Sequence, residues 1–520
     1  MPEHFRALAF ILTLTLPIFF AARAKIGPGV IARADFNRRF GVWLGVLLCA
    51  FLPGNYWAYI LASGALMDWA ALCDRNPLAL FLGLMFVVPP ITTFVPGFGS
   101  ISYFFEINHL RLASITILGV AYIRLMRDGT AERFGSFLLD WLVLAYLLLQ
   151  LVLLTRTDPT ATAILRTMFE LFVDGYLPYT VASRGVRHLP AVREAMASLL
   201  LAIMLTAPVA LFELSKNWLL YAGLTEALGL SWEIMPYIMR DGNVRPIGPA
   251  GISLVFGYVL AMGVCLYACA RAWLPSRVWI ASYALLAAGL FASMARGSYV
   301  GAVVAVLIVA GTGQGAGQRV AKLLLLAAVL AVGVAFSPFA DKVLGYLPFV
   351  GDVDVDNVTY RKILFDVSLQ VISLNPFFGS SDFMQNPMME QLRQGQGLID
   401  IVNSYLGVAL GSGYVGLGLY LSIFGTALVM LVKSIARSAG AHAELELLGR
   451  SLLGALIGTM IIIATASTIL SMPFLIWIAL GLSVRCHRLV MNSSYASPES
   501  PARGTLQTAT RPRTPSPGMR

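Results

Sequence analysis

Apolar segments long enough to cross a lipid bilayer recur along almost the whole chain, and mostly short polar connections separate them. A helix that spans the hydrocarbon core needs about 20 mainly apolar residues, so this pattern leaves most of the surface facing lipid. Only 12% of the residues are charged, whereas soluble globular proteins carry about 25%. Most soluble enzymes, disordered proteins and disulfide-rich secreted domains are therefore excluded. The sequence predicts an all-α polytopic membrane protein with about 12 to 15 transmembrane helices.

Clusters of arginine and lysine separate alternate apolar segments and set the predicted orientation. Short cytoplasmic loops of membrane proteins are enriched in Lys and Arg, which accounts for much of the net charge of +10. No basic stretch is interleaved with base-stacking aromatic residues, so we expect no nucleic-acid partner. With the basic loops inside, the predicted external connections are 93–107, 155–160, 214–249, 295–297 and 338–401.

The chain divides into four predicted parts. Residues 1–337 form N-terminal transmembrane helices, residues 338–401 a large periplasmic loop, and residues 402–487 C-terminal transmembrane helices. Residues 488–520 become rich in Ser, Pro, Thr and Arg, which predicts a disordered basic cytoplasmic tail. The large loop contains an amphipathic stretch that fits either the membrane surface or a face of the helix bundle: Tyr360, Ile363, Leu364, Val367 and Val371.

Several arginines fall on the predicted external side, against the usual distribution of positive charge, and we single out Arg245, Arg296, Arg361 and Arg393. Arg245 precedes a helix and Arg296 lies between two helices, and each has a glycine nearby that lets a ligand approach the backbone. Arg361 and Arg393 lie in the large loop, where contact with lipid headgroups or carboxylates is an equal alternative. The planar guanidinium group binds phosphate and diphosphate in a bidentate manner, so we predict a functional role for Arg245 and Arg296.

The large loop ends in a polar segment that leads into a glycine-rich helix. Asp400, Asn403 and Tyr405 lie at this boundary, where Asp400 and Asn403 act either as a helix cap or as groups that face a substrate. The glycines of the helix that follows predict close packing against a neighbouring helix: Gly407, Gly411, Gly413, Gly416 and Gly418.

Ionisable residues inside the apolar segments are costly in lipid and therefore informative. The sequence has four such residues in its first half: Asp140, Arg166, Glu170 and Asp174. Arg166 and Glu170 are spaced i, i+4 and are predicted to pair within one helix. The alternative interpretation is a coupling path of a transporter.

An acidic alternation in the large loop, Asp352–Asn357, resembles part of a metal-binding loop. An EF-hand needs Gly at its sixth position and Glu at its twelfth, which here are Asn357 and Ile363. We expect neither a metal nor another cofactor. Apart from the terminal His4, only His109 among the histidines falls near the predicted external face, and it is kept as a candidate substrate-binding residue.

Three blocks of the chain resemble the O-antigen ligase/polymerase family, which comprises bacterial membrane glycosyltransferases that act on polyprenyl-diphosphate-linked sugars. The first two blocks are Arg245–Gly251 with Gly257 and Tyr258, and Arg296 with Gly297. The third block runs from the large loop into the glycine-rich helix and includes Tyr360 with Arg361, Asn375–Gly379, Asn403–Leu406 and Gly413–Leu417.

Two departures from the family pattern bear on the activity. In the ligases a histidine usually precedes the asparagine of the loop-to-helix motif, and this chain has Val402 there. An acidic residue is also common before the Gly-x-x-Gly-Leu stretch, where this chain has Gly411 and Ser412. The missing histidine favours a polymerase, in which arginines are the expected functional groups.

The resemblance implies a helical bundle of the GT-C type in the bacterial inner membrane, with metal-independent glycosyl transfer from a polyprenyl-diphosphate-linked donor. The predicted catalytic residues are Arg296, Arg245 and, as the general base, Asp400. The predicted substrate-binding residues are Arg361, Arg393, Asn403, Tyr405 and His109. Expected partners are the undecaprenyl-type lipid-linked oligosaccharide, the bilayer, and a chain-length regulator and a flippase of the same pathway. A ligase that transfers glycan to lipid A-core and a transporter of lipid-linked sugars are the alternatives.

Overall fold

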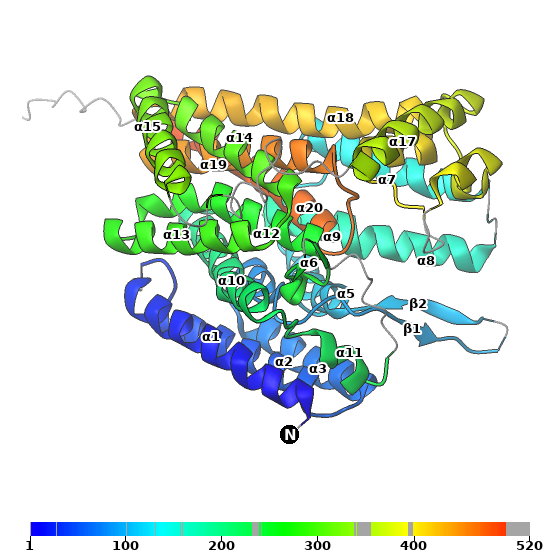
Figure 1. Ribbon diagram of the computed structural model, residues 1–520, viewed down its shortest axis with the longest axis horizontal. Helices are drawn as coiled ribbons and strands as arrows, with labels where there is room; N and C mark the ends of the chain where they lie inside the picture. Colours follow the sequence, from blue (N-terminus) through cyan, green and yellow to red (C-terminus); the bar gives the residue numbers. More distant parts are fainter. Residues whose placement is uncertain are drawn as a thin grey trace, which may run out of the picture.

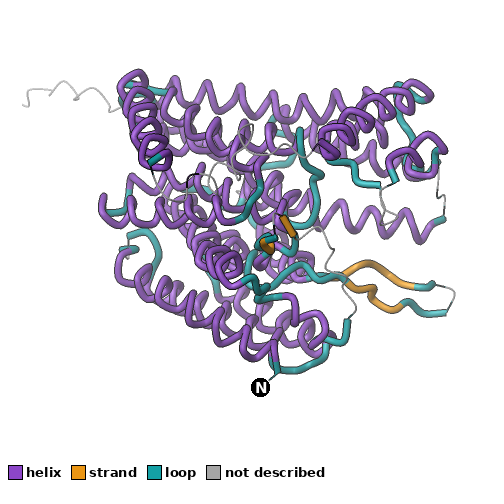
Figure 2. Tube along the Cα trace, viewed as in Figure 1, coloured by secondary structure: helices purple, strands orange, loops and turns teal. Residues whose placement is uncertain are grey.

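The computed structural model shows an all-α bundle, as the sequence predicts (Figures 1 and 2). It describes residues 2–27, 29–99, 101–129, 132–156, 158, 160–230, 239–240, 242–336, 340, 355–393 and 399–495. Strands occur within these residues only as two short antiparallel hairpins: β1 (Thr93–Pro96) with β2 (Tyr103–Ile107), and β3 (Met239–Arg240) with β4 (Asn243–Val244).

The helices of the first half are α1 (Glu3–Lys25), α2 (Arg33–Phe51), α3 (Tyr56–Cys73), α4 (Pro77–Leu84), α5 (His109–Ala113), η1 (Ser114–Leu118), α6 (Gly119–Arg127), α7 (Leu138–Leu154), α8 (Ala161–Leu171), η2 (Phe172–Tyr176), α9 (Leu177–Arg184), α10 (Leu189–Lys216) and α11 (Ala222–Ala227). Those of the second half are η4 (Gly248–Ala250), α12 (Ser253–Leu266), η5 (Tyr267–Ala272), α13 (Ser276–Ala292), α14 (Arg296–Gly311), α15 (Ala316–Ala335), α17 (Val355–Leu374), η6 (Phe383–Gln385), η7 (Pro387–Leu392), α18 (Ser404–Ser438), α19 (Ala443–Ile463) and α20 (Met472–Tyr495).

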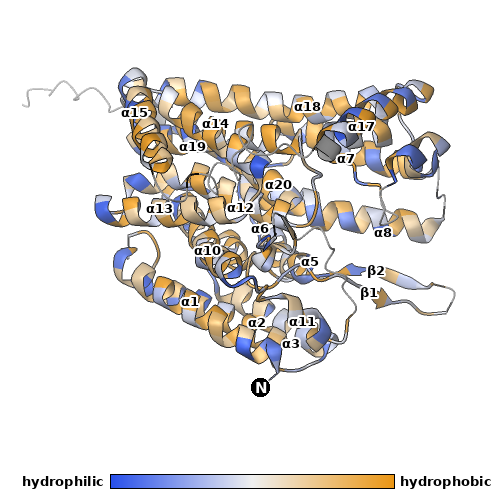
Figure 3. Ribbon diagram, in the orientation of Figure 1, coloured by the Kyte–Doolittle hydropathy of each residue, from blue (hydrophilic) through white to orange (hydrophobic). Residues whose placement is uncertain are grey.

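The helices have the length and composition of membrane spans. Among the described residues, eight helical segments are long and apolar enough to cross a bilayer, and the shorter helices α7, α13 and α14 are also apolar. Hydrophobic residues predominate along the helices (Figure 3). The chain is therefore a multi-pass membrane protein.

Polar contacts define two ends of the bundle. At one end, Arg193 and Glu444 form an ion pair of 2.6 Å that joins the first turns of α10 and α19. At the other end, the indole N–H of Trp218, just after α10, donates to Glu3 of α1 at 2.7 Å. We call this second end the site end. It carries Arg245 in the α10–α12 connection and Arg296 at the α13–α14 junction, and the α19–α20 connection lies there as well. The basic clusters of the sequence collect at the opposite end.

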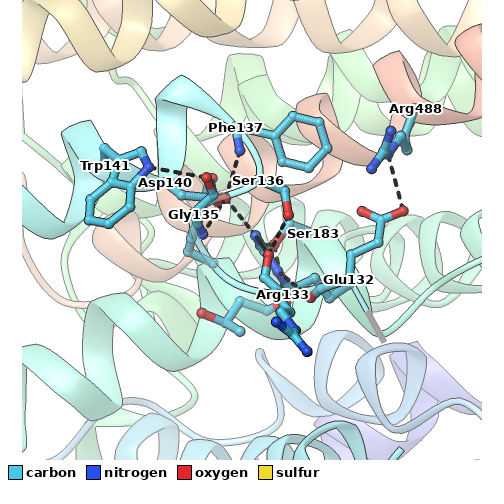
Figure 4. A network of polar contacts seen from close by, with 12 residues as sticks. Glu132, Arg133, Gly135, Ser136, Phe137, Asp140, Trp141, Ser183 and Arg488 are labelled. Carbon is cyan, nitrogen blue, oxygen red and sulfur yellow. Dashed lines mark hydrogen bonds and ion pairs between the residues drawn. The ribbon is translucent and has the colours of Figure 1, made fainter. Parts of the chain in front are cut away.

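Asp140 anchors a buried polar network at the opposite end (Figure 4). Its carboxylate is fully buried and lies 2.6 Å from the guanidinium of Arg184 and 2.7 Å from the hydroxyl of Tyr179. It also accepts backbone N–H bonds from Gly135 and Phe137 at 3.0 and 3.1 Å. A buried charge is tolerated when it is paired and hydrogen-bonded in this way, so Asp140 has a structural role.

The predicted pair of Arg166 with Glu170 is wrong. Arg166 instead donates to two backbone carbonyls of strand β2 and stacks on the ring of Tyr103 at 3.6 Å. Glu170 and Asp174 both pair with Arg111 of α5, at 3.1 and 2.9 Å. Contacts with other elements replace the helical pair. The open edge of the β1–β2 hairpin offers carbonyl groups to Arg166, and Arg111 of α5 offers a cation to Glu170.

Helix α20 continues beyond the predicted start of the tail. It runs to Tyr495, with Val490 buried and Arg488 bonded to Glu132 at 3.1 Å. These contacts hold Arg488 and Val490 against the bundle, and residues 496–520 of the predicted tail lie outside the described residues.

Helix α18 is broken at Gly413, and the large loop fills the break. Gly413 has φ 64° and ψ −167°, so the N–H groups of the next residues turn away from the helix. Tyr414 donates to the carbonyl of Pro376 at 2.7 Å, and Val415 donates to that of Phe377 at 3.1 Å. The loop backbone thus replaces the missing helical partners.

Two glycines permit this close contact. A Cβ atom on Gly413 would lie 2.3 Å from the carbonyl carbon of Phe377, and one on Gly379 would lie 2.4 Å from the carbonyl oxygen of Leu410. Gly379 also has positive φ, and the N–H of Ser380 donates to Leu410 at 2.9 Å. The prediction that Gly413 permits close packing against a neighbouring helix is therefore wrong. Gly413 instead allows the backbone to break and the large loop to contact it.

The amphipathic stretch of the large loop packs over the bundle. Leu364, Val367 and Val371 of α17 are buried in a small core, whereas Ile363 is exposed. This core also contains residues of η7 and of the first turns of α18: Met389, Leu392, Leu406, Ala409 and Leu410. The loop is thus a folded cap on α18, seen with the β1–β2 hairpin at the right in Figure 1.

Replacing Gly413 with Ala should destabilise the protein, because Ala disfavours this backbone conformation by about 2–3 kcal/mol and its methyl group meets the loop carbonyl. Gly418→Ala is the matched control, since no atom lies within 4 Å of a Cβ at that helical position. Thermal unfolding in detergent should show a lower midpoint for Gly413→Ala and an unchanged or higher one for Gly418→Ala. Equal midpoints would contradict the interlocked break.

Candidate functional site

The Arg245 segment is held by the C-terminal end of α10. Arg245 is half-buried and directly follows strand β4. The N–H of Val244 donates to the side-chain oxygen of Asn217 at 3.0 Å. Two residues after Arg245, the N–H groups of Ile247 and Gly248 donate to Glu213 at 2.9 Å each. The backbone is thus fixed on both sides of Arg245.

Arg296 is the first residue of α14 and lies at a tight junction with α13. Helix α12, which follows the Arg245 segment, packs directly against this junction: a Cβ on Gly257 would lie 2.3 Å from the Cβ of Ala295. On the other side, a Cβ on Gly297 would lie 2.7 Å from the hydroxyl of Thr465. The Arg296 junction therefore contacts both the helix that follows Arg245 and the α19–α20 loop.

Asp400 meets the same α19–α20 loop. The hydroxyl of Ser467 lies 3.2 Å from Asp400 Oδ1 and 2.8 Å from the carbonyl oxygen of Ile401. The hydroxyl of Ser404, the first residue of α18, donates to the carbonyl of Ala466 at 2.8 Å. Residues 465–467 thus connect the Arg296 junction to the Asp400 segment.

The large loop reaches Asp400 from the other direction. The hydroxyl of Tyr360 donates to the backbone carbonyl of Asp400 at 2.7 Å and accepts its N–H at 3.1 Å. Surrounding protein raises the pKa of the Asp400 carboxyl, and the Ser467 hydrogen bond and the charge of Arg361 oppose this shift. The raised pKa is what a general base or acid at this position would need.

Backbone strain also concentrates at the site end. Three described residues other than glycine have left-handed backbone conformations: Asn217 (φ 49°), Met294 (φ 53°) and Leu470 (φ 54°). They lie next to the Arg245 anchor, in the Arg296 junction and in the α19–α20 loop, respectively. Asn217 is an ordinary left-handed cap of α10, because asparagine tolerates this conformation. Met294 and Leu470 are the strained residues, and such residues persist where surrounding contacts over-determine the backbone.

The remaining candidates divide into those near Asp400 and those elsewhere. Asn403 caps α18 by accepting the N–H groups of Tyr405 and Leu406 at 2.9 and 3.2 Å, which supports the helix-cap alternative for this residue. The hydroxyl of Tyr405 donates to the carbonyl of Met460 in α19 at 2.9 Å. Asn403 and Tyr405 therefore position the start of α18 beside Asp400.

Two predicted residues are not brought to this group. Arg393 is exposed and pairs with Glu390 at 2.6 Å, and this contact lowers the pKa of the Glu390 carboxyl. His109 is buried, with its ring nitrogens 3.1 Å from the Tyr59 hydroxyl and 2.8 Å from the Leu84 carbonyl. These contacts give His109 a place in the helix packing.

Glu213 and the α19–α20 loop are the functional candidates that sequence reasoning missed. Residues 464–471 read Ala-Thr-Ala-Ser-Thr-Ile-Leu-Ser, a hydroxyl-rich stretch between two apolar helices. That composition was the available signal for the loop. Nothing in the sequence links Glu213 to a segment 34 residues away.

The described residues contain no group of three His, Cys, Asp or Glu side chains arranged to hold a metal ion. The acidic alternation Asp352–Asn357 lies outside this description, apart from the backbone at the start of α17. Among the described residues, the groups around Arg245, Arg296 and Asp400 are instead arginines, the carboxylates of Asp400 and Glu213, and several hydroxyls.

A comparison with protein families identifies the central part of the chain. Residues 281–421 match the family model described as O-Antigen ligase. Over these residues the chain is similar to the O-antigen ligase family. This segment runs from α13 into α18 and contains Arg296, Asp400 and the interlocked glycines, while Arg245 and the α19–α20 loop lie outside it. A search of curated proteins finds no significant match to the chain. The resemblance to the O-antigen ligase/polymerase family, whose members are glycosyltransferase-like membrane enzymes, is confirmed over that segment.

Proposed function

We propose that this protein is a polysaccharide polymerase that joins polyprenyl-diphosphate-linked oligosaccharide repeat units on the periplasmic face of the bacterial inner membrane. The product class is an exopolysaccharide, a capsule or an O-antigen. The observation that carries this proposal is the arrangement at the site end: the Arg296 junction touches both α12, which follows Arg245, and the loop that contacts Asp400. The O-antigen ligase match supports the same reaction class.

The two arginines receive the diphosphate of the donor, whose polyprenyl tail stays in the bilayer. A guanidinium group forms paired, charge-assisted hydrogen bonds with phosphate oxygens. As the bond between the anomeric carbon and the diphosphate oxygen breaks, negative charge grows on the leaving diphosphate. Arg245 and Arg296 stabilise that charge, which is the largest contribution that fixed cations make to catalysis.

Asp400 serves as the general base for the acceptor. A sugar hydroxyl of a second lipid-linked unit attacks the anomeric carbon and forms the new glycosidic bond. Its proton passes to the Asp400 carboxylate, and polyprenyl diphosphate leaves with the bonding electron pair. Arg361, whose charge acts on Asp400, favours the ionised form that accepts the proton.

Val402 favours a polymerase over a ligase of the same family. It occupies the position before Asn403, where the ligases usually carry a histidine. The second candidate, ligation of a finished glycan, follows from the family description alone. In a deletion strain, accumulation of single lipid-linked repeats on the outer leaflet supports the polymerase. Full polymer retained on its polyprenyl carrier supports the ligase, and repeats trapped inside indicate a flippase.

Arg296→Ala should abolish polymer formation, because loss of one charge-stabilising donor lowers such rates by about 100- to 1,000-fold. Single lipid-linked repeat units should still reach the outer leaflet. Arg127→Ala is the control, since Arg127 is an exposed arginine at the opposite end of the bundle. Gel profiles of extracted polysaccharide measure chain length, and polymer of normal length in Arg296→Ala cells would contradict the proposal.

Asp400→Asn should lower the polymerisation rate by about 100-fold or more, as expected for loss of a general base. Because the pKa of Asp400 is raised above its usual value, the wild-type rate should fall as the pH drops through that higher pKa and the carboxylate becomes protonated. The residual rate of Asp400→Asn should lack this dependence. Asp366→Asn, an exposed change on α17, should keep both the wild-type rate and its pH profile. A wild-type rate in Asp400→Asn would remove Asp400 from the mechanism.

A further inference from the structure

Glu213 of α10 is a fully buried carboxylate whose hydrogen bonds all point to backbone within the described part of the chain. Its Oε1 atom accepts the N–H of Leu220 at 2.9 Å. Its Oε2 atom accepts the N–H groups of Ile247 and Gly248, also at 2.9 Å. The carboxylate thus ties both ends of the long α10–α12 connection to one point on α10.

The sequence around these two donors makes the contact specific. Ile247 and Gly248 lie between Pro246 and Pro249, and proline has no N–H group. Across this four-residue stretch, Glu213 therefore accepts every backbone N–H that exists. On the other side of the stretch, a Cβ on Gly248 would lie 2.6 Å from the ring of Phe256, so the segment has no room to shift away from α10.

Arg245 lies between two attachments to the same helix end. Before it, Val244 donates to Asn217, the residue that ends α10. After it, Ile247 and Gly248 donate to Glu213, one turn earlier on α10. Asn217 has φ 49°, a left-handed conformation that aims its side chain at the Arg245 strand. The end of α10 therefore sets where the Arg245 backbone lies.

We propose that Glu213 is the positioning residue for Arg245, a role that rests on the proposed diphosphate site. Burying a carboxylate is costly, and three N–H donors are needed to offset that cost. A glutamine has only one oxygen, so its amide group would face at least one of these N–H groups as a second donor. The segment would then move, and the guanidinium of Arg245 would lose its fixed place opposite the diphosphate.

A double-mutant cycle on the full-length protein in lipid nanodiscs tests this role. The probe is farnesyl diphosphate, and the readout is its dissociation constant by titration calorimetry. Arg245→Ala should weaken binding by about 10- to 100-fold, and Glu213→Gln by about 10-fold. The double variant should bind within about twofold of Arg245→Ala, because displacing an absent side chain has no further effect. Glu226→Gln, an exposed carboxylate on α11, should bind like the wild type.

The outcomes separate this inference from the proposed function. Wild-type binding by Glu213→Gln, or losses that multiply in the double variant, would overturn the positioning role while leaving the Arg245 site intact. Wild-type binding by Arg245→Ala would overturn the diphosphate site itself. If Glu213→Gln does not assemble, Asn217→Gly tests whether the end of α10 positions Arg245. Glycine keeps the left-handed turn and removes only the bond to Val244. It should weaken binding by about threefold, with no further loss in the Arg245→Ala background, whereas wild-type affinity would overturn the proposal.

Discussion

The site end depends on the backbone hydrogen bonds between the large loop and α18 at the Gly413 break. Within a bilayer, a backbone N–H released from a helix has no water to replace its partner. Here the carbonyls of Pro376 and Phe377 supply the replacement, and glycines at 379 and 413 let the two backbones meet. The same contact docks α17 on α18 and thereby brings Tyr360 and Arg361 to Asp400. The arrangement of Tyr360 and Asp400 at this end thus depends on satisfying a few backbone groups.

The buried carboxylates Asp140, Asp74 and Glu213 all have polar partners, but the kind of partner differs between the two ends of the bundle. At the opposite end, Asp140 is matched by Arg184, and Arg39 bonds Asp74 at 2.8 Å, so these charges hold helices together. At the site end, Glu213 is matched by backbone N–H groups, so its charge fixes a loop. Glu213 therefore holds the backbone of the Arg245 segment, whereas Asp140 and Asp74 hold helices.

Hydropathy and family motifs were sufficient to predict the all-α membrane fold and the family likeness of the segment that holds Arg296 and Asp400. The packing face of α17 also followed from its 3.6-residue period, except at Ile363. Pairing between distant segments did not. Arg166 and Glu170 have the spacing of a helical pair, yet the β2 carbonyls and Arg111 compete more effectively for them. Glu213 acts through tertiary contacts that no local pattern encodes, and the α19–α20 loop had only its hydroxyl-rich composition as a signal. The geometry of Asn403 decided between its two alternatives in favour of the helix cap.

The central claim is that Arg245 and Arg296 together hold the diphosphate of a polyprenyl-linked substrate. The most direct measurement is an electron cryo-microscopy structure of the protein in lipid nanodiscs with bound undecaprenyl diphosphate. Phosphate oxygens should lie about 3 Å from both guanidinium groups, with the polyprenyl tail leaving the site end into the bilayer. Diphosphate density at the opposite end of the bundle, or in contact with neither arginine, would contradict it.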